Sequence, residues 1–202
     1  MLLGLGISEA MPHPFLAADE LTKAGLAGDA VRLTNPLVAG DDVLRTSLRP
    51  GLLKAIAFNE SHRRPGVALF EVGHVYPPSD QVLPAEYEAL GIVLAGGDAM
   101  QAVGIWRELA SAMGWGARLD QSAVPAGLHT ARAATLSLGR DVIGAVGEIH
   151  PDVAEAFEHG LDDVVRARPG GDVGLNEVFG IVTRRKLPRG GEHLAAAGPQ
   201  AI

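Results

Sequence analysis

The sequence has 202 residues, 47% of them hydrophobic and 20% charged, with a formal net charge of −7 and no cysteine. This length suits one globular domain with an apolar core. The lack of cysteine excludes disulfides and thiolate metal sites and fits a cytoplasmic protein. The acidic balance argues against a domain that holds a nucleic-acid backbone by itself, and no apolar run approaches the roughly 20 residues that cross a bilayer.

The first part of the chain predicts short elements separated by turns. Residues 2–9 are typical of the end of a helix or the entry to a strand, and Pro12 and Pro14 favour an extended stretch. Residues 19–24 predict a short helix that stops at Gly25. Residues 31–33 alternate like a strand and run into a turn at Asn35 and Pro36.

A longer helix is predicted after Arg45. Thr46 or Ser47 can cap it, and Pro50 suits its first turn, where a missing N–H group costs nothing. Its apolar residues recur at helical spacing, and Pro65 and Gly66 end the pattern. This stripe consists of Leu48, Leu52, Leu53, Ile56 and Ala57.

The remaining elements alternate between strands and helices. The sequence predicts strands at 68–76, 90–95, 133–138 and 142–146, and helices at 103–113 and 150–157. Gly139-Arg140-Asp141 joins the last two strands as a hairpin turn. Such short links argue against a parallel doubly wound sheet. The expected fold class is therefore α+β, an antiparallel sheet flanked by helices.

The chain divides by composition near residue 165. We expect residues 1–165 to form the core domain. Residues 166–202 are rich in Gly, Pro, Arg and Ala, and we expect a divergent, loosely ordered tail. Only residues 175–182 within it are able to form a strand.

No known catalytic motif is present. The sequence lacks a phosphate-binding glycine loop, a nucleophile elbow and a helical pair of histidines, so we predict no catalytic and no metal-binding residues. A metal site that the fold assembles from His74, His129 and His150 stays open as an alternative. We interpret these histidines as structural or surface residues.

Two acidic residues, Glu71 and Glu148, lie inside apolar strand-like runs. A buried carboxylate needs a partner to offset its loss of hydration, and Arg45 and Arg132 are the candidates for that role. A structural ion pair is the favoured interpretation, and a catalytic acid with a shifted pKa is the alternative.

Several stretches, in this order, resemble one family. They are residues 4–15 (GLGISEAMPHPF), 33–37 (LTNPL), 44–53 (LRTSLRPGLL), 69–76 (LFEVGHVY), 128–134 (LHTARAA) and 143–153 (IGAVGEIHPDV). Together they are similar to the core domain of the bacterial phenylalanyl-tRNA synthetase beta subunit, over roughly residues 1–158.

The resemblance implies a fold like a class II aminoacyl-tRNA synthetase core that has lost its catalytic residues. It implies packing against a catalytic alpha subunit in a heterotetramer, contact with tRNA only through that complex, and ATP and magnesium used by the assembled enzyme and not by this chain. It also implies interface or structural roles for a set of residues. These are Asn35, Pro36, Arg45, Thr46, Ser47, Pro50, Gly51, Glu71, Gly147, Glu148, His150 and Pro151.

The leucine-rich helix after Arg45 is the predicted centre of the interface, with an exposed apolar patch at residues 48–58. We expect the chain to be a shortened piece of the subunit, without its editing and anticodon-binding domains. Three alternatives remain. The chain is a freestanding paralogue that binds an amino acid or regulates another enzyme, a hydrolase that uses Glu71 or Glu148 with a histidine, or a truncated frame that does not fold stably.

Overall fold

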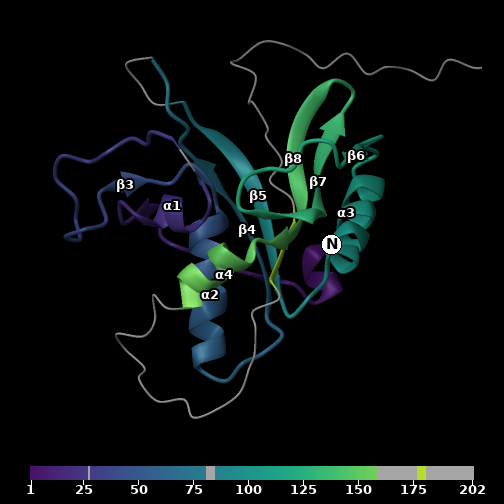
Figure 1. Cartoon of the computed structure of the whole chain (residues 1–202), viewed down its shortest axis with the longest axis horizontal. Coiled ribbons are helices and arrows are strands. Elements are labelled where there is room, and N and C mark those ends of the chain that lie inside the picture. Colours follow the sequence, from purple (N-terminus) through teal and green to yellow (C-terminus); the bar gives the residue numbers. More distant parts are fainter. Residues whose placement is uncertain (27, 81–84, 159–176, 181–202) are drawn as a thin grey trace, which may run out of the picture.

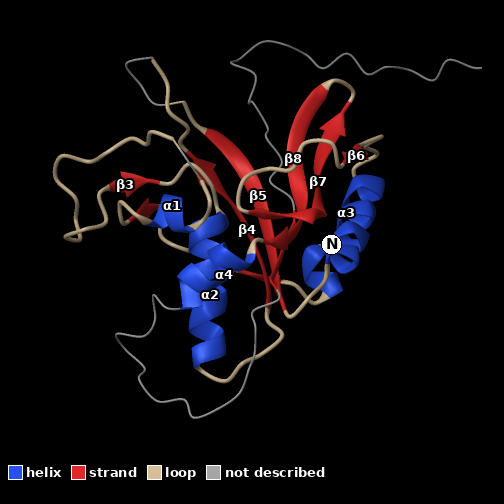
Figure 2. Cartoon of the chain, in the orientation of Figure 1, coloured by secondary structure: helices blue, strands red, loops and turns tan. Residues whose placement is uncertain are grey.

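The computed structural model describes residues 1–26, 28–80, 85–158 and 177–180. In this part of the chain one mixed sheet separates two groups of helices (Figures 1 and 2). The first group contains α1 (Glu20–Lys23), α2 (Arg49–Ser61) and α4 (Pro151–Glu158). The second contains the 3-10 helix η1 (Leu2–Leu5) and α3 (Ala99–Ala112). The result is a three-layer arrangement with helices on both faces of the sheet.

The described strands form a seven-stranded sheet in the order β1-β4-β5-β9-β8-β7-β6. Its strands are β1 (Ser8–Glu9), β4 (Ala68–Val75), β5 (Tyr87–Ala95), β6 (Arg118–Asp120), β7 (Leu128–Leu138), β8 (Asp141–Ile149) and β9 (Glu177–Gly180). The β1–β4 pair is parallel and the other pairs are antiparallel. A separate two-stranded sheet joins β2 (Phe15–Leu16) to β3 (Val43–Leu44).

Strand β9 lies in the middle of the large sheet. It pairs with β5 at Ile92–Ala95 and with β8 at Val146–Glu148. It therefore joins the β4–β5 hairpin to the β7–β8 hairpin in one surface. Within the expected tail, the sequence marks only residues 175–182 as able to form a strand, and β9 lies within that range. The rest of the predicted tail lies outside the described residues.

Strand periodicity divides the core between the two faces of the sheet. On β5, Ala89 and Val93 point toward α2, whereas Leu90 and Ile92 point toward α3. This alternation follows from the two-residue repeat of a strand, and a strand that is buried on both faces therefore has few polar positions.

The apolar stripe of α2 packs against the sheet of its own chain. Leu48, Leu52, Leu53 and Ile56 each have 0% of their surface exposed. Each such side chain contributes about 1.5–3 kcal/mol of burial free energy. Gly91 on β5 permits the close approach, because a Cβ atom there would lie 2.7 Å from Leu52 Cδ1.

Most predicted elements are confirmed, and their lengths differ. The hairpin strands reach Leu128 and Ile149, well beyond the predicted 133–146. Helix α3 begins earlier than predicted, because Asp98 and Gln101 form a capping box at its N-terminus. The prediction of an antiparallel sheet holds for the large sheet except at β1, which runs parallel to β4.

The predicted cap of α2 is wrong. Leu48 occupies the N-cap position, and no side chain caps the helix. Ser47 instead accepts a hydrogen bond from the Arg49 backbone N–H group at 3.2 Å. Pro50 lies in the first turn, as predicted, but the helix ends at Ser61, before Pro65 and Gly66. Arg63 has a positive φ of 59°, so the chain leaves the helical conformation there.

Candidate functional site

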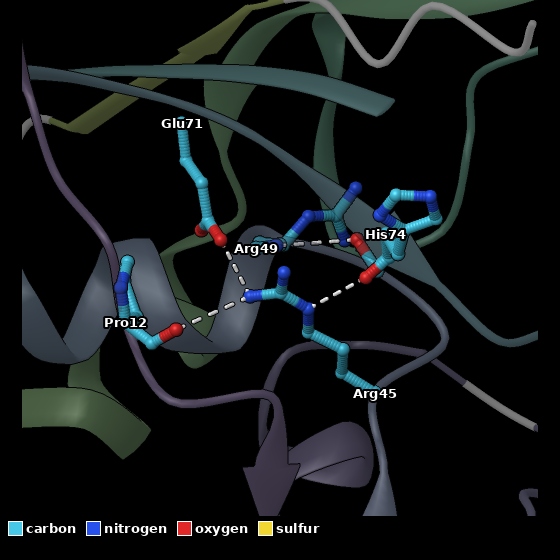
Figure 3. A network of polar contacts seen from close by, with 6 residues as sticks. Pro12, Arg45, Arg49, Glu71 and His74 are labelled. Carbon is cyan, nitrogen blue, oxygen red and sulfur yellow. Dashed lines mark hydrogen bonds and ion pairs between the residues drawn. The ribbon is translucent and has the colours of Figure 1, made fainter. Parts of the chain in front are cut away.

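Three charged side chains are buried together on the α2 face of the sheet. Arg45 comes from the segment between β3 and α2, Arg49 from the first turn of α2, and Glu71 from β4. They are 6%, 5% and 3% exposed. Figure 3 shows their polar groups between the Pro12 segment and β4. We call Arg45, Arg49 and Glu71 the buried charge cluster.

Arg45 forms an ion pair with Glu71. Its Nη1 atom lies 2.6 Å from Glu71 Oε1. Its Nε–H group donates to the His74 carbonyl at 2.8 Å, and Nη1 also donates to the Pro12 carbonyl at 3.5 Å (Figure 3). One guanidinium therefore links three segments of the chain. The prediction that Arg45 serves as the partner of a strand carboxylate is confirmed.

The Glu71 carboxylate is only partly compensated. Its Oε2 atom is buried and has no hydrogen-bond partner among the described residues. Burial raises the pKa of Glu71, and the attraction of Arg45 opposes this shift without cancelling it. The geometry is that of a structural pair, because Glu71 Oε1 points at Arg45 and not at an open cavity.

Arg49 binds backbone carbonyl groups. Its Nη1 atom donates to the Ala24 carbonyl at 2.9 Å and to the Ala126 carbonyl at 2.8 Å. Burial lowers the pKa of Arg49 to about 10, so the side chain stays charged at neutral pH. It thus joins the end of α1, the loop before β7 and the start of α2.

Glycines make room for both guanidinium groups. A Cβ atom on Gly73 would lie 2.4 Å from Arg45 Nη2, and one on Gly127 would lie 2.2 Å from Arg49 Nη1. Gly127 also has φ of 80°, a conformation that favours glycine. The cluster therefore depends on backbone positions as well as on its own side chains.

A second ion pair joins Arg132 on β7 to Glu148 on β8. It confirms Arg132 as the other predicted partner. The pair is much less buried than the first, since the Arg132 side chain is 51% exposed. An exposed pair of this kind contributes little to stability.

An open groove lies outside the buried charge cluster. It has a volume of about 570 Å³, and its walls come from residues 10–16, α2 and the end of α4. Met11 is 89% exposed and Phe58 is 56% exposed, while Phe157 lies buried beneath. Lys54 at the rim pairs with Glu20 at 2.7 Å. We call this feature the Met11–Phe58 groove.

The groove and the cluster are connected through Pro12. The Pro12 carbonyl accepts from Arg45, and its ring packs on Gly51 of α2, where a Cβ atom would lie 2.8 Å from Pro12 Cβ. Pro12 also lines the groove. The buried charges thus fix the position of the segment that carries Met11.

The structure brings only part of the predicted interface set together. Arg45, Pro50, Gly51 and Glu71 are buried near the start of α2. Thr46 and Ser47 beside them are half-buried, and Asn35 and Pro36 lie in the loop before β3.

The remaining residues of the predicted interface set lie at the junction of β8 and α4. Gly147 and Glu148 are in β8, and Pro151 opens α4. His150 links the two, because its carbonyl accepts from the N–H groups of Val153 and Ala154.

The predicted exposed patch on α2 is wrong for its leucines. These leucines are covered by the chain's own sheet, so they do not form an exposed binding surface. Within the predicted patch, Phe58 is the exposed large apolar residue, and it faces the Met11–Phe58 groove.

Sequence reasoning missed Arg49 and Gly127. The signal for Arg49 was available in the sequence. Arg49 stands three positions before Leu52 and seven before Ile56, so it lies on the apolar stripe of the helix.

The described residues contain no group of three or more His, Asp or Glu side chains placed to hold a metal. None of the described helices is long and apolar enough to cross a membrane.

Comparison with known proteins assigns the family. The model of the phenylalanyl tRNA synthetase beta chain CLM domain matches residues 1–164. The chain belongs to this CLM domain family. The beta subunit of phenylalanine–tRNA ligase from Geobacillus kaustophilus is 35% identical, over 78% of this chain and 22% of the relative. That from Deinococcus radiodurans is 28% identical, over 100% of this chain and 25% of the relative.

The match is to a part of those relatives. The chain spans about a quarter of the length of the curated beta subunits that it matches. Among solved structures, the pyrrolysyl tRNA synthetase PylSc of Desulfitobacterium hafniense has a TM-score of 0.59 at 16% identity. The alignment covers 91% of this chain and 62% of that one, and it shows a shared fold.

Proposed function

We propose that the chain is the non-catalytic core of a phenylalanine–tRNA ligase beta subunit. In this proposal it supports aminoacylation of tRNA(Phe) by packing against the catalytic alpha subunit. ATP and magnesium are used by the assembled cytoplasmic enzyme, and tRNA is reached through the complex. The finer fold assignment, a class II synthetase core, is part of the same proposal.

The family match over residues 1–164 carries the proposal. The contacts of the buried charge cluster support a non-catalytic role. Arg45 and Glu71 bind each other, and Arg49 binds backbone carbonyl groups of its own chain. These groups hold the fold together and do not line the Met11–Phe58 groove.

The surface also supports a scaffold role. The groove combines exposed Met11 and Phe58 over a base fixed by the buried charge cluster. Exposed apolar side chains around a hollow are typical of a protein-binding surface. The relatives from Geobacillus kaustophilus and Deinococcus radiodurans are ligase beta subunits. They do not favour the alternative of a freestanding module that binds an amino acid.

Co-purification with the alpha subunit tests the proposal. A tagged cognate alpha subunit should retain the 202-residue chain at micromolar concentration. Phe58→Asp and Met11→Asp should each weaken retention at least about tenfold, since a charge would have to be buried at the interface. Met100→Asp is the matched control, because Met100 is 70% exposed on α3.

Two results would count against the proposal in different ways. Absence of any complex with the unmodified chain would remove the scaffold role. Retention of the Phe58→Asp variant at the level of the control would leave the role intact and move the interface away from the groove.

A further inference from the structure

The far edge of the sheet carries a short exposed strand. Strand β6 ends the strand order, and among the described residues it pairs on one side only, with β7. All three of its residues, Arg118, Leu119 and Asp120, are exposed. An unpaired strand edge is a template for another strand, and proteins usually block it.

The backbone at this edge has a defined direction. The Asp120 carbonyl accepts a hydrogen bond from Thr135 Oγ1 on β7 at 3.0 Å, so it points toward β7. Backbone groups of successive residues in a strand point to opposite sides. The N–H and C=O groups of Leu119 therefore point away from β7, on the side where β6 has no neighbouring strand among the described residues.

The three side chains of β6 are a cation, Arg118, an apolar residue, Leu119, and an anion, Asp120. In an antiparallel pair with the same segment of a second molecule, centred on Leu119, each residue meets a fixed partner. Leu119 lies opposite Leu119 of the second copy, and Arg118 lies opposite its Asp120. The segment is thus complementary to itself in charge and in shape.

We propose that β6 pairs with β6 of a second copy of this chain around a two-fold axis at Leu119. The two Leu119 residues exchange both backbone hydrogen bonds, and the two Arg118–Asp120 pairs flank them on the opposite face. The large sheet then continues across the axis. A strand of different sequence would not place opposite charges against Arg118 and Asp120. The charge pattern therefore favours pairing with a second copy over pairing with other strands.

The flanking contacts leave both charges available. Arg118 Nη2 donates to the Gly139 carbonyl at 3.0 Å, which occupies one of its five N–H groups. Asp120 Oδ1 accepts from the Ser122 N–H group at 2.8 Å, and the Asp120 side chain is exposed. The hydrogen bond from Ser122 lowers the pKa of Asp120, so the carboxylate is charged at neutral pH.

Charge exchange provides the test, with the self-association constant of the 202-residue chain measured by sedimentation velocity. A three-residue contact is small, so we expect weak, rapidly reversible dimers. Asp120→Arg or Arg118→Asp places like charges opposite each other twice and should weaken the dimer about tenfold. The double variant Arg118→Asp/Asp120→Arg restores both pairs and should recover it.

Further variants separate this pairing from a general charge effect. A mixture of the Asp120→Arg and Arg118→Asp chains should form mixed dimers in preference to either dimer alone. Leu119→Pro removes the outward N–H donor and should abolish association, with the fold checked by circular dichroism. Asp141→Arg makes the same charge change at an exposed residue outside β6 and should leave association unchanged.

The outcomes are distinct from those for the alpha subunit. A chain that stays monomeric up to millimolar concentration overturns the pairing, as does a double variant that fails to recover association. Equal weakening by Asp141→Arg would also overturn it. None of these results bears on retention by the alpha subunit, because the variants in that experiment, Met11→Asp and Phe58→Asp, lie at the groove beside α2.

Discussion

The two faces of the sheet are stabilised in different ways. The face under α3 is covered by an apolar cluster that includes Trp106, Ile92 and Leu136. The face under α2 has a larger apolar cluster, and it also contains Arg45, Arg49 and Glu71. On the α3 face, the ion pair of Arg132 and Glu148 remains near solvent.

This comparison shows that the buried charges of the described residues lie on the α2 face of the sheet. Burial of an ion pair seldom adds net stability, because the loss of hydration offsets the attraction. The buried cluster does something that apolar packing does not. Arg45 and Arg49 bind the carbonyl groups of Pro12 and Ala126, which lie in loops, and Arg45 also binds that of His74 in β4. The α2 face therefore orders irregular segments, including the wall of the Met11–Phe58 groove.

The largest expected effect is the loss of one member of the buried pair. Arg45→Ala leaves the Glu71 carboxylate buried without a cation, and Glu71→Ala leaves the guanidinium without an anion. Each should lower the free energy of unfolding by about 3–5 kcal/mol, measured by urea denaturation. Arg132→Ala, at the exposed pair, should cost at most about 1 kcal/mol.

A double variant sharpens this contrast. Arg45→Met/Glu71→Leu removes both charges and should cost less than either single alanine variant, because no buried charge is left unpaired. A residual cost of about 1–3 kcal/mol is expected for the His74 and Pro12 carbonyls that lose their donor. Additive losses in the double variant would show that the pair is not coupled, and the contrast between the faces would fail.

A smaller effect is expected at the glycine beside Arg49. Gly127 and Gly139 both have positive φ, 80° and 64°, so alanine strains the backbone at either position. Only at Gly127 would the new Cβ atom meet neighbours, Arg49 Nη1 at 2.2 Å and the Ala24 carbonyl at 2.6 Å. Gly127→Ala should therefore be less stable than Gly139→Ala by about 1–3 kcal/mol in thermal or urea unfolding. Equal losses would mean that the contact at Arg49 relaxes freely.

The apolar parts of both faces were predictable from the sequence. The stripe of α2 and the alternation of the β7–β8 hairpin each predict an element and its buried side, because burial imposes the period of the helix or the strand. The limits of β7 and β8 were underestimated, since Leu128 and Ile149 lie beyond the continuous apolar run and pair across a register shift.

The buried charges were predictable in part. Glu71 and Glu148 are recognisable as acids inside apolar runs, and Arg45 and Arg132 as their partners. Arg49 could not be given a role, because its carbonyl partners lie 25 and 77 residues away in the chain. The central position of β9 was hidden for the same reason. A sequence pattern shows that a residue is buried, but it does not show which distant backbone group it meets.

The smallest predicted effect concerns pH and separates Glu71 from a surface acid. The folded state holds the Glu71 proton more tightly than the unfolded chain does, since burial raises its pKa. Its favourable contribution is therefore complete below the unfolded value of roughly 4.3 and is lost as the pH rises through the folded value. As the pH falls from 7 toward the unfolded value, the unfolding free energy of the unmodified chain should rise relative to that of Glu71→Gln.

Asp19 should show the opposite sign. A hydrogen bond from Lys23 lowers the pKa of Asp19, so its contribution is present above the unfolded value and is lost as the pH falls. The unmodified chain should thus lose stability relative to Asp19→Asn when the solution is acidified toward pH 3, and the loss should be small because the pair is exposed. If the Glu71 and Asp19 comparisons gave slopes of the same sign, the Glu71 carboxylate would not be paying a net desolvation cost, and Arg45 would fully compensate it. The buried cluster would then be a stabilising ion pair in its own right, and its ordering of the Pro12 segment would be a by-product of that stability.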